Sequence, residues 1–443
     1  MIRSTVARNT AWILLDNVIS LALSFGVTML VARYLGPEKF GLFSYTFATA
    51  SIFAIVGHLG LDGLVVREFK LRPDENEAIL GTVFNLKLVA YAAAAAAMML
   101  YAFWAHAGDS TAITLFGFAA LSTVFSSTGA LNAWFQARSE NRYPSMASII
   151  SKVVMAVLKI GAIAMASGVA MFAAANAAGA ALAFALTYFF FRWAGGTSIF
   201  KWKSSIGEAR RLMGEGFLLF LAAAFTTIYL KIGQVMLQWM STPKELGNYA
   251  VAALLSEAIY ILPIAITTAV FPRMIQSFHR SAEEFEYELQ LLFDFLVILG
   301  LCAILGVVLF SNPVIMLAFG EKYGSVYKLL SILSLAIPFM FLRAALNRWI
   351  VITRLSLVNV IMQGAGALLN IALGFALIPH FHAEGAAAAT VVSYAFATYA
   401  SLAISPQTRP LFRTMSRSLL MPWGAALRLW QFGKSYRTRP GAV

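Results

Sequence analysis

Runs of about 20 mostly apolar residues constrain the fold of this chain more than any other feature of its sequence. A helix needs about that length to cross the hydrocarbon core of a bilayer. Apolar residues make up 60% of the 443 residues, whereas soluble globular chains contain roughly 45–50%. A water-soluble fold of this length cannot bury so much apolar surface, so the sequence predicts a polytopic membrane protein. A globular enzyme on one anchor, a disordered scaffold and a secreted disulfide-rich protein are excluded.

The apolar runs are continuous and rich in Ala, Leu and Ile, which predicts membrane-spanning helices rather than the alternating strands of a closed barrel. We expect an all-α integral membrane fold with twelve transmembrane helices. The first run has no small-residue cleavage site and is too long for a signal peptide, so it is interpreted as a retained span. The expected spans are 11–32, 42–64, 80–104, 113–136, 146–166, 170–191, 215–240, 249–271, 289–310, 327–346, 356–378 and 386–404.

Lysine and arginine are distributed unevenly between the two sides of the predicted bundle. The segments on the side of the N-terminus carry 24 of them, and the opposite loops carry 5. Because positive residues accumulate in cytoplasmic loops, both termini are predicted to be cytoplasmic. The net charge of +13 is therefore attributed to topology rather than to nucleic-acid binding.

Parts of the sequence occur twice. GPEKFGLF at 36–43 recurs as TPKELGNY at 242–249, and ALNAW at 130–134 recurs as ALNRW at 345–349. Chance similarity is the alternative in such biased sequence, but the matches fall at equivalent places in the predicted topology. They predict two duplicated halves of six spans, related by a pseudo-twofold axis along the membrane normal.

The duplication predicts four parts of the chain. These are an N-terminal six-helix lobe (1–191), a basic cytoplasmic linker (192–214), a C-terminal six-helix lobe (215–404) and a basic cytoplasmic tail (405–443). The loops between spans are short, so no soluble domain is expected between them.

Motifs of the common enzyme classes are missing from the sequence. It contains no GxxxxGK[ST], HExxH, GxSxG or CxxC. His380 and His382 lie two residues apart, but no third ligand follows at the usual zinc spacing, so we expect a solvated turn. The sequence therefore predicts no enzyme, no catalytic residue, no metal site and no cofactor. A transporter with its own ATPase domain is excluded, which leaves an ion gradient or the substrate gradient as the driving force.

Charged residues within the predicted spans are the main candidates for function. Each costs roughly 2.5–3.5 kcal/mol near a helix centre, so most should face the bundle interior or a watery cavity. Those near the predicted cytoplasmic ends, Lys87, Lys152 and Asp294, could instead extend to the interface. The full set is Asp16, Lys87, Lys152, Lys159, Lys231, Glu257 and Asp294.

The spacing of the polar residues indicates which of them share a helix face. Lys152 and Lys159 are two turns apart, and Lys231, Gln234 and Gln238 follow one face of the next lobe's first span. Four buried lysines without a buried arginine predict a cationic interior suited to an anionic substrate. The candidate substrate-binding residues are Lys159, Lys231, Lys152, Lys87 and Gln234.

Two further sets of polar residues have competing interpretations. Asn359, Gln363 and Asn370 form an uncharged stripe, for which contact between helices is favoured over the wall of a water-filled path. Asp16 and Glu257 are candidate ion-coupling residues, because buried carboxylates can exchange protons. A structural pair with a buried lysine is the alternative for each carboxylate.

Four stretches of the chain resemble a known family in their order and spacing. They are RYLGPEKFGLFSYTFA (33–48), GLDGLVVRE (60–68), GNYAVAALLSEAIYILPIAITTAVFPRM (247–274) and ALLNIALGFALIPHFHAEGAAAATVVSYAFATYASLA (367–403). Over essentially the whole chain, the sequence resembles the oligosaccharide flippases of polysaccharide biosynthesis, the Wzx type. The resemblance implies membership of the MOP superfamily, which also holds MATE exporters and lipid II flippases.

The resemblance implies a MATE-like fold with twelve helices in two pseudo-symmetric lobes around a central cavity, in a bacterial inner membrane. The implied substrate is an undecaprenyl-diphosphate-linked oligosaccharide, which is moved to the periplasmic leaflet for O-antigen, capsule or exopolysaccharide synthesis. The expected partners are this substrate, membrane lipids, a polysaccharide polymerase and a chain-length regulator. We expect a monomer that binds no nucleic acid.

Two other functions stay open on the sequence. A cation-coupled multidrug exporter of the same superfamily would need interior carboxylates, which the interior lysines outnumber by four to three. A polysaccharide polymerase or ligase would need large outer loops to hold its donor and acceptor.

The tail is predicted to lie along the inner leaflet, outside the transport path. Its basic residues and apolar rings alternate as in segments that lie in the headgroup layer. The residues concerned are Arg409, Arg413, Arg417, Trp423, Leu427, Arg428, Trp430 and Lys434.

Overall fold

The computed structural model describes residues 2–437, and every regular element in this range is helical. An all-α membrane fold is thereby confirmed. In chain order the elements are α1 (Ile2–His58), α2 (Asp62–Leu71), η1 (Pro73–Glu75), α3 (Asn76–Ala105), α4 (Ser110–Phe125), η2 (Ser126–Thr128), α5 (Gly129–Ala137), α6 (Arg142–Ala164), α7 (Val169–Trp193), η3 (Ile199–Lys201), α8 (Ile206–Met240), α9 (Pro243–Ile259), α10 (Ile261–Arg280), α11 (Ala282–Phe319), η4 (Glu321–Tyr323), α12 (Val326–Ser334), α13 (Ile337–Thr353), α14 (Ser356–Thr398), η5 (Ala400–Ala403), α15 (Arg409–Leu420) and α16 (Pro422–Arg437).

Within the described range, nine helical stretches are long and apolar enough to cross a membrane, or ten if α12 and α13, bent by 44°, form one span. Two stretches, 11–71 and 356–403, have 61 and 48 residues, about three and two times the length that a bilayer core requires. Each contains a residue with non-helical backbone, Gly36 (φ 71°, ψ 170°) in α1 and His382 (φ 50°, ψ −126°) in α14. Both stretches are therefore interrupted inside.

Several helices extend beyond the apolar runs that predicted them. Helix α8 begins at Ile206, inside the predicted linker, and α11 continues to Phe319, inside the predicted outer loop. Ser281 caps α11 by accepting a hydrogen bond from the Glu284 amide at 3.0 Å. Hydropathy detects only the apolar part of a helix, whereas backbone hydrogen bonding continues into the polar turns at each end.

Contacts divide the chain into two compact units. The first contains residues up to Gln238 together with 242–247, and the second contains 239–241 together with the residues from Asn248. Helix α8 thus belongs mostly to the first unit, although the sequence places it at the start of the second lobe. The boundaries of the duplicated lobes stay a prediction.

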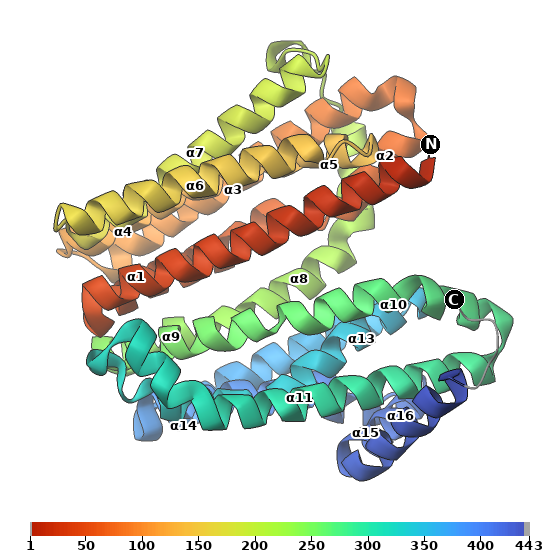
Figure 1. The fold of residues 1–443 in the computed structure, drawn as a ribbon. Coiled ribbons are helices and arrows are strands. Elements are labelled where there is room, and N and C mark those ends of the chain that lie inside the picture. The colour runs from red at the N-terminus through yellow and green to blue at the C-terminus, as the bar shows by residue number, and fades with distance from the viewer. Residues whose placement is uncertain (1, 438–443) are drawn as a thin grey trace. The chain divides into compact units, whose positions relative to one another are not determined.

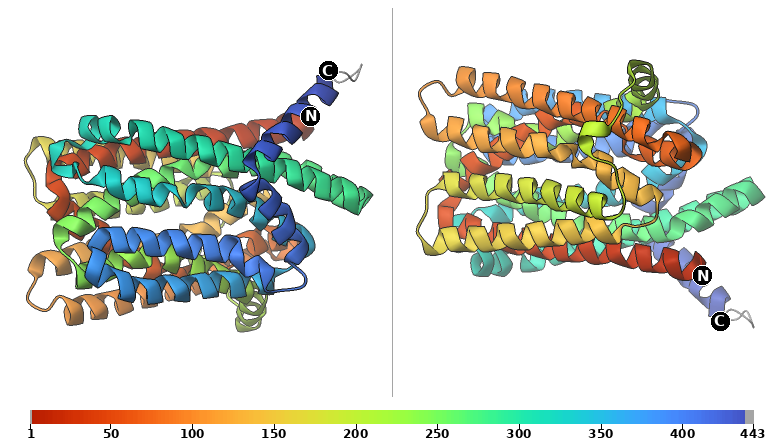
Figure 2. Two further views of the ribbon diagram at one scale, coloured as in Figure 1. Left: turned by 90° about the horizontal axis from the view of Figure 1, so that it is seen from below. Right: turned by 90° about the horizontal axis from the view of Figure 1, so that it is seen from above.

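In the first unit, α1, α3, α4, α6 and α7 run side by side (Figure 1; Figure 2). The shorter helices α2 and α5 pack against each other and against α3. They enclose an apolar cluster that includes Leu64, Phe84, Phe135 and Phe191. This cluster fixes the end of the unit at which the candidate site lies.

In the second unit, α11 contacts α10, α12 and α13, and it also carries the tail helices α15 and α16 (Figure 1). Helix α14 packs against α12 and α13. A Cβ atom added to Gly366 would lie 2.6 Å from Cβ of Ala397. The two parts of α14 on either side of His382 therefore pack closely together.

Large apolar side chains point outward along the long helices. Leu100, Phe189, Leu317 and Phe375 are each more than half exposed. A water-soluble protein rarely exposes so many large apolar groups, whereas a lipid-facing surface requires them.

The two copies of the first repeat contact each other in a reciprocal way. A Cβ atom added to Gly41 would lie 2.7 Å from the Pro243 carbonyl oxygen, and one added to Gly247 would lie 1.9 Å from the Pro37 carbonyl oxygen. Each glycine of one copy thus packs on the proline of the other copy. This arrangement explains why both copies retain a Pro and a Gly four residues apart.

Replacing Gly247 with Ala is expected to lower the stability of the protein by about 1–3 kcal/mol, because overpacking forces the backbone apart. Gly117→Ala in α4 is the matched control, since an added Cβ there meets nothing within 4 Å. That change removes a helical glycine and should be neutral or slightly stabilising. Thermal unfolding in detergent, followed by tryptophan fluorescence, compares the two. Equal unfolding temperatures would contradict the contact between the repeats.

A charged network connects α2 to the beginning of α8. The carboxylate of Glu68, 5% exposed, accepts hydrogen bonds from Arg67 (2.9 Å), Arg72 (2.8 Å) and Arg211 (2.6 Å). Glu208 and Glu215 on α8 complete it through the same arginines. The basic linker is therefore tied to the first unit by ion pairs.

Candidate functional site

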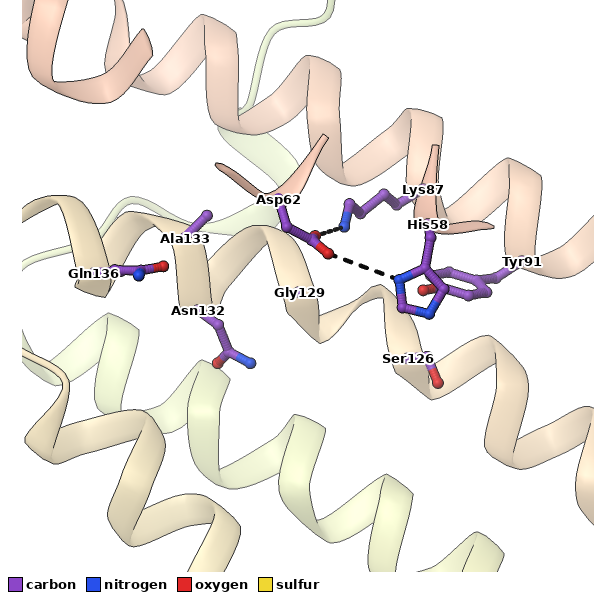
Figure 3. Close-up of a pocket in the computed structure, with 9 residues that line it drawn as sticks. All are labelled: His58, Asp62, Lys87, Tyr91, Ser126, Gly129, Asn132, Ala133 and Gln136. Carbon is purple, nitrogen blue, oxygen red and sulfur yellow. Dashed lines mark hydrogen bonds and ion pairs between the residues drawn. The ribbon is translucent and has the colours of Figure 1, made fainter. Parts of the chain in front are cut away.

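A polar pocket of about 280 Å³ in the first unit brings titratable side chains of three helices together (Figure 3). Asp62, the first residue of α2, accepts a hydrogen bond from the Lys87 ammonium group of α3 at 2.5 Å. The other carboxylate oxygen faces Nδ1 of His58, near the end of α1, at 3.7 Å. The Lys87 side chain is 2% exposed, whereas that of Asp62 is 64% exposed. The remaining lining residues are Tyr91, Ser126, Gly129, Asn132, Ala133 and Gln136.

The turn between α1 and α2 places His58 beside Asp62. Leu59 and Gly60 have positive φ angles of 53° and 67°, which redirect the chain after α1. A Cβ atom added to Gly60 would lie 2.3 Å from the Gly216 carbonyl oxygen of α8. Glycine is thus required at position 60 for two reasons, the left-handed backbone conformation and the close approach of α8.

Gly129, the first residue of α5, leaves the space that the lysine occupies. A Cβ atom at this position would lie 3.1 Å from Nζ of Lys87 and 3.8 Å from Oδ1 of Asp62. The next residues form the ALNAW copy of the second repeat, and Asn132 of this copy lines the pocket. Part of the duplicated sequence therefore builds the wall of the site.

Lys152 lies in a neighbouring pocket of about 350 Å³ that shares Ser126, Gly129 and Asn132 with the first. Its ammonium group donates to the hydroxyl of Ser20 and lies 3.9 Å from Oδ1 of Asp16. Lys87 and Lys152 thus approach the same short segment from two sides. The structure brings these two predicted residues to adjacent pockets of one unit.

The other predicted substrate-binding residues lie elsewhere in the first unit. Lys159 is 6% exposed and lies 6.0 Å from the centre of the Phe43 ring. Lys231 is half-buried on α8, and Gln234 is buried one turn further along. Their part in substrate binding stays a prediction.

The two predicted ion-coupling carboxylates have different surroundings. Asp16 accepts a hydrogen bond from Ser20 at 2.7 Å and is the nearest carboxylate to Lys152, as the structural alternative expects. Glu257 is half-buried on α9 in the second unit. A role in coupling stays a prediction for both.

Lys87 and Asp294, for which an extension to the interface is the alternative, are each buried against an ionic partner, Asp62 and Arg428 respectively. The expectation of an interior without a buried arginine is wrong, since Arg343 of α13 is buried and donates to Oδ1 of Asn359 on α14. The polar stripe on α14 provides this partner, so the guanidinium group can stay inside the unit.

Sequence reasoning missed His58 and Asp62 as site residues. Both belong to the expected span 42–64, so the criterion that selected the lysines also applies to them. What the linear sequence does not contain is the turn at Gly60, which brings Asp62 against Lys87 25 residues further on.

Most of the chain matches a known protein family. Residues 6–278 match the family described as "Polysaccharide biosynthesis protein", which is more than half of the chain. The chain belongs to this family. No curated protein sequence matches this polysaccharide biosynthesis protein significantly.

Solved structures resemble this polysaccharide biosynthesis protein over nearly its whole length. The lipid II flippase MurJ in an inward closed conformation has a TM-score of 0.70 at 15% identity and covers 93% of this chain and 92% of its own. An inward-facing multidrug resistance MATE family transporter of the MOP superfamily has a TM-score of 0.68 at 13% identity, with 91% and 96% covered. A MOP superfamily transporter from Pyrococcus furiosus, described as having a binding pocket of reversed polarity, has a TM-score of 0.59 at 14% identity, with 93% and 96% covered. At these identities the likeness shows a shared fold.

Proposed function

We propose that this polysaccharide biosynthesis protein is a flippase for an undecaprenyl-diphosphate-linked oligosaccharide, which it moves from the cytoplasmic to the periplasmic leaflet of a bacterial inner membrane. The observation that carries the proposal is the buried ammonium group of Lys87 in a polar pocket of a membrane-spanning unit. A bare diphosphate pays many kcal/mol of desolvation in a medium of low dielectric. Ammonium groups along the path offset that cost, and the prenyl chain can stay in the lipid.

The fold supports the passage of such a molecule. We propose twelve spans, because the ten candidate spans include two long stretches that are interrupted at Gly36 and His382. Two six-helix lobes (1–191 and 215–404) would then surround a central cavity, with both termini in the cytoplasm. The reciprocal contact of Gly41 and Gly247 supports the duplication.

Lys159, Lys231, Lys152, Lys87 and Gln234 are the proposed substrate-binding residues. Lysine suits transit, because its compact ammonium group contacts phosphate without the fixed bidentate geometry of arginine. The same charges repel the cationic drugs that an exporter would carry. We propose a monomer whose partners are the lipid-linked oligosaccharide, membrane lipids, a polysaccharide polymerase and a chain-length regulator.

The tail helices are proposed to lie in the headgroup layer of the inner leaflet. Arg409, Arg413 and Arg417 of α15 are exposed, and Trp423 and Trp430 of α16 are exposed as well. Each cation adds roughly 1 kcal/mol of attraction to an anionic leaflet. With the other tryptophans replaced by Phe, brominated lipids are expected to quench the remaining pair strongly. Unquenched emission would place the tail in water.

The function is tested in a strain that lacks the gene. Mass spectrometry should find one complete undecaprenyl-diphosphate-linked repeat unit accumulating on the cytoplasmic side, and the plasmid-borne gene should clear it. Accumulation of drugs without any lipid-linked intermediate would favour an exporter instead.

Proteoliposomes with an imposed proton or sodium gradient test coupling through Asp16 or Glu257. Transport that is indifferent to both gradients would exclude that role for the two carboxylates.

A further inference from the structure

We infer that Asp62 is a built-in counterion of Lys87, which an anionic group of the substrate displaces, and that His58 is the second partner of the displaced carboxylate. This inference rests on the proposed function for the identity of the anion, a diphosphate diester. It assigns an anion-binding site to the pocket in Figure 3, in which Lys87 binds the anion and Asp62 and His58 take part in the exchange of counterions.

The two partners of the ion pair differ in their exposure. Lys87 is held on a long helix with its side chain 2% exposed, so its charge stays in the pocket. Asp62 begins a helix after a tight turn and is 64% exposed. A buried cation needs a negative partner at all times, because an unpaired buried charge costs several kcal/mol. The exposed carboxylate can fill that role when no substrate is bound and leave when a phosphate group arrives.

His58 offers the displaced carboxylate a second partner. Its Nδ1 lies 3.7 Å from Oδ2 of Asp62, on the side of the carboxylate that faces away from Lys87 (Figure 3). The titratable groups that line the pocket are His58 of α1, Asp62 of α2, and Lys87 and Tyr91 of α3. Helix α5 and η2 contribute uncharged Ser126, Asn132 and Gln136, which can donate hydrogen bonds to phosphate oxygens or sugar hydroxyls.

The effect of removing either charge follows from this arrangement. Replacing Asp62 by a neutral residue removes the charge that competes for Lys87, so binding of the anion should strengthen. Replacing Lys87 by a neutral residue removes the cation itself, so binding should weaken.

The experiment measures binding to the full-length protein in lipid nanodiscs. The probe is a short-chain prenyl diphosphate linked to N-acetylglucosamine, which is a diphosphate diester like the proposed substrate. Asp62→Asn is expected to bind it about tenfold more tightly than wild type, which corresponds to roughly 1.4 kcal/mol. Lys87→Met is expected to bind it about tenfold more weakly. His58→Gln removes the second partner of the displaced carboxylate and should also weaken binding.

Asp74→Asn is the matched control, since this exposed carboxylate of η1 lies outside the pocket. It should leave the affinity unchanged. Wild-type affinity in Lys87→Met overturns the inference, even if Asp62→Asn fails to fold. If the wild type binds the probe and exports its substrate, but Asp62→Asn binds the probe with wild-type affinity, the counterion role is overturned. The proposed flippase function is not affected by that result. A wild type that neither binds the probe nor clears the lipid-linked intermediate overturns the proposed function and this inference together.

Discussion

Replacing Lys159 with Ala is expected to abolish export of the lipid-linked oligosaccharide without lowering the stability of the protein. The Lys159 side chain is 6% exposed, and among the described residues no carboxylate lies within ion-pair distance of it. A buried cation without an ionic partner costs stability in the resting protein, so removing it should be neutral or stabilising. Such a charge is retained because it meets an anion during transport.

Lys152→Ala is the matched comparison on the same face of α6. It would leave Asp16 without its nearby cation, so this variant should lose stability as well as any contribution to export. Lys231→Ala, in α8, is expected to abolish export like Lys159→Ala. Export is measured by complementation of the deletion strain at matched protein levels, and stability by thermal unfolding in detergent.

Two results would contradict the role of the deep lysines. Full complementation by both Lys159→Ala and Lys231→Ala at normal expression would exclude them from the transport path. A large loss of stability in Lys159→Ala would show that the ammonium group holds the helices together instead of meeting the substrate.

The sequence predicts the helices of this protein well because lipid imposes a simple length and hydropathy rule on each span. The same rule does not describe how two consecutive spans are joined. At Gly36 and His382 a single residue with unusual backbone angles interrupts the helix, and the flanking residues remain helical. A hydropathy window places a loop there but contains no information on its backbone.

The candidate site could be predicted only in part. The cost of burying charge is enough to select Lys87 and Lys152 from the sequence, and the pockets at both residues share a wall. The partners of these charges are set by long-range contacts, which the linear spacing does not contain. Asp62 reaches Lys87 only because the turn at Gly60 fits against α8.

Asp294 gives the clearest case of a partner hidden from sequence reasoning. It lies in the predicted span 289–310, and its position near the end of that span is compatible with an extension to the interface. In the structure it is 0% exposed and accepts hydrogen bonds from Nε of Arg428 at 2.7 Å and from Nη2 at 2.8 Å. Ser418 and Gln290 also donate to the same carboxylate. The tail, which is expected to lie along the inner leaflet, is therefore also anchored to α11.

Arg428→Ala is expected to lower the stability of the second unit by about 3–5 kcal/mol, because removing one member of a buried ion pair leaves the other uncompensated. The carboxylate contact raises the pKa of the Arg428 guanidinium, so the arginine is charged throughout the physiological range and the loss should not depend on pH near neutrality. Arg413→Ala, at an exposed position of α15, is the matched control and should change little. Thermal unfolding measures the loss, and hydrogen exchange should rise in α15 and α16.

A double change separates the ionic contact from the packing of the tail. Asp294→Leu with Arg428→Met replaces the pair by apolar groups and is expected to recover most of the lost stability, since such replacements are often neutral or stabilising. Failure of the double variant to recover would assign the loss to packing around Arg428 instead of to the unpaired carboxylate of Asp294.

If the tail only anchors the protein, inserted Arg428→Ala protein should still clear the lipid-linked intermediate at matched abundance. Correctly inserted, abundant protein that exports nothing would place the tail within the transport mechanism.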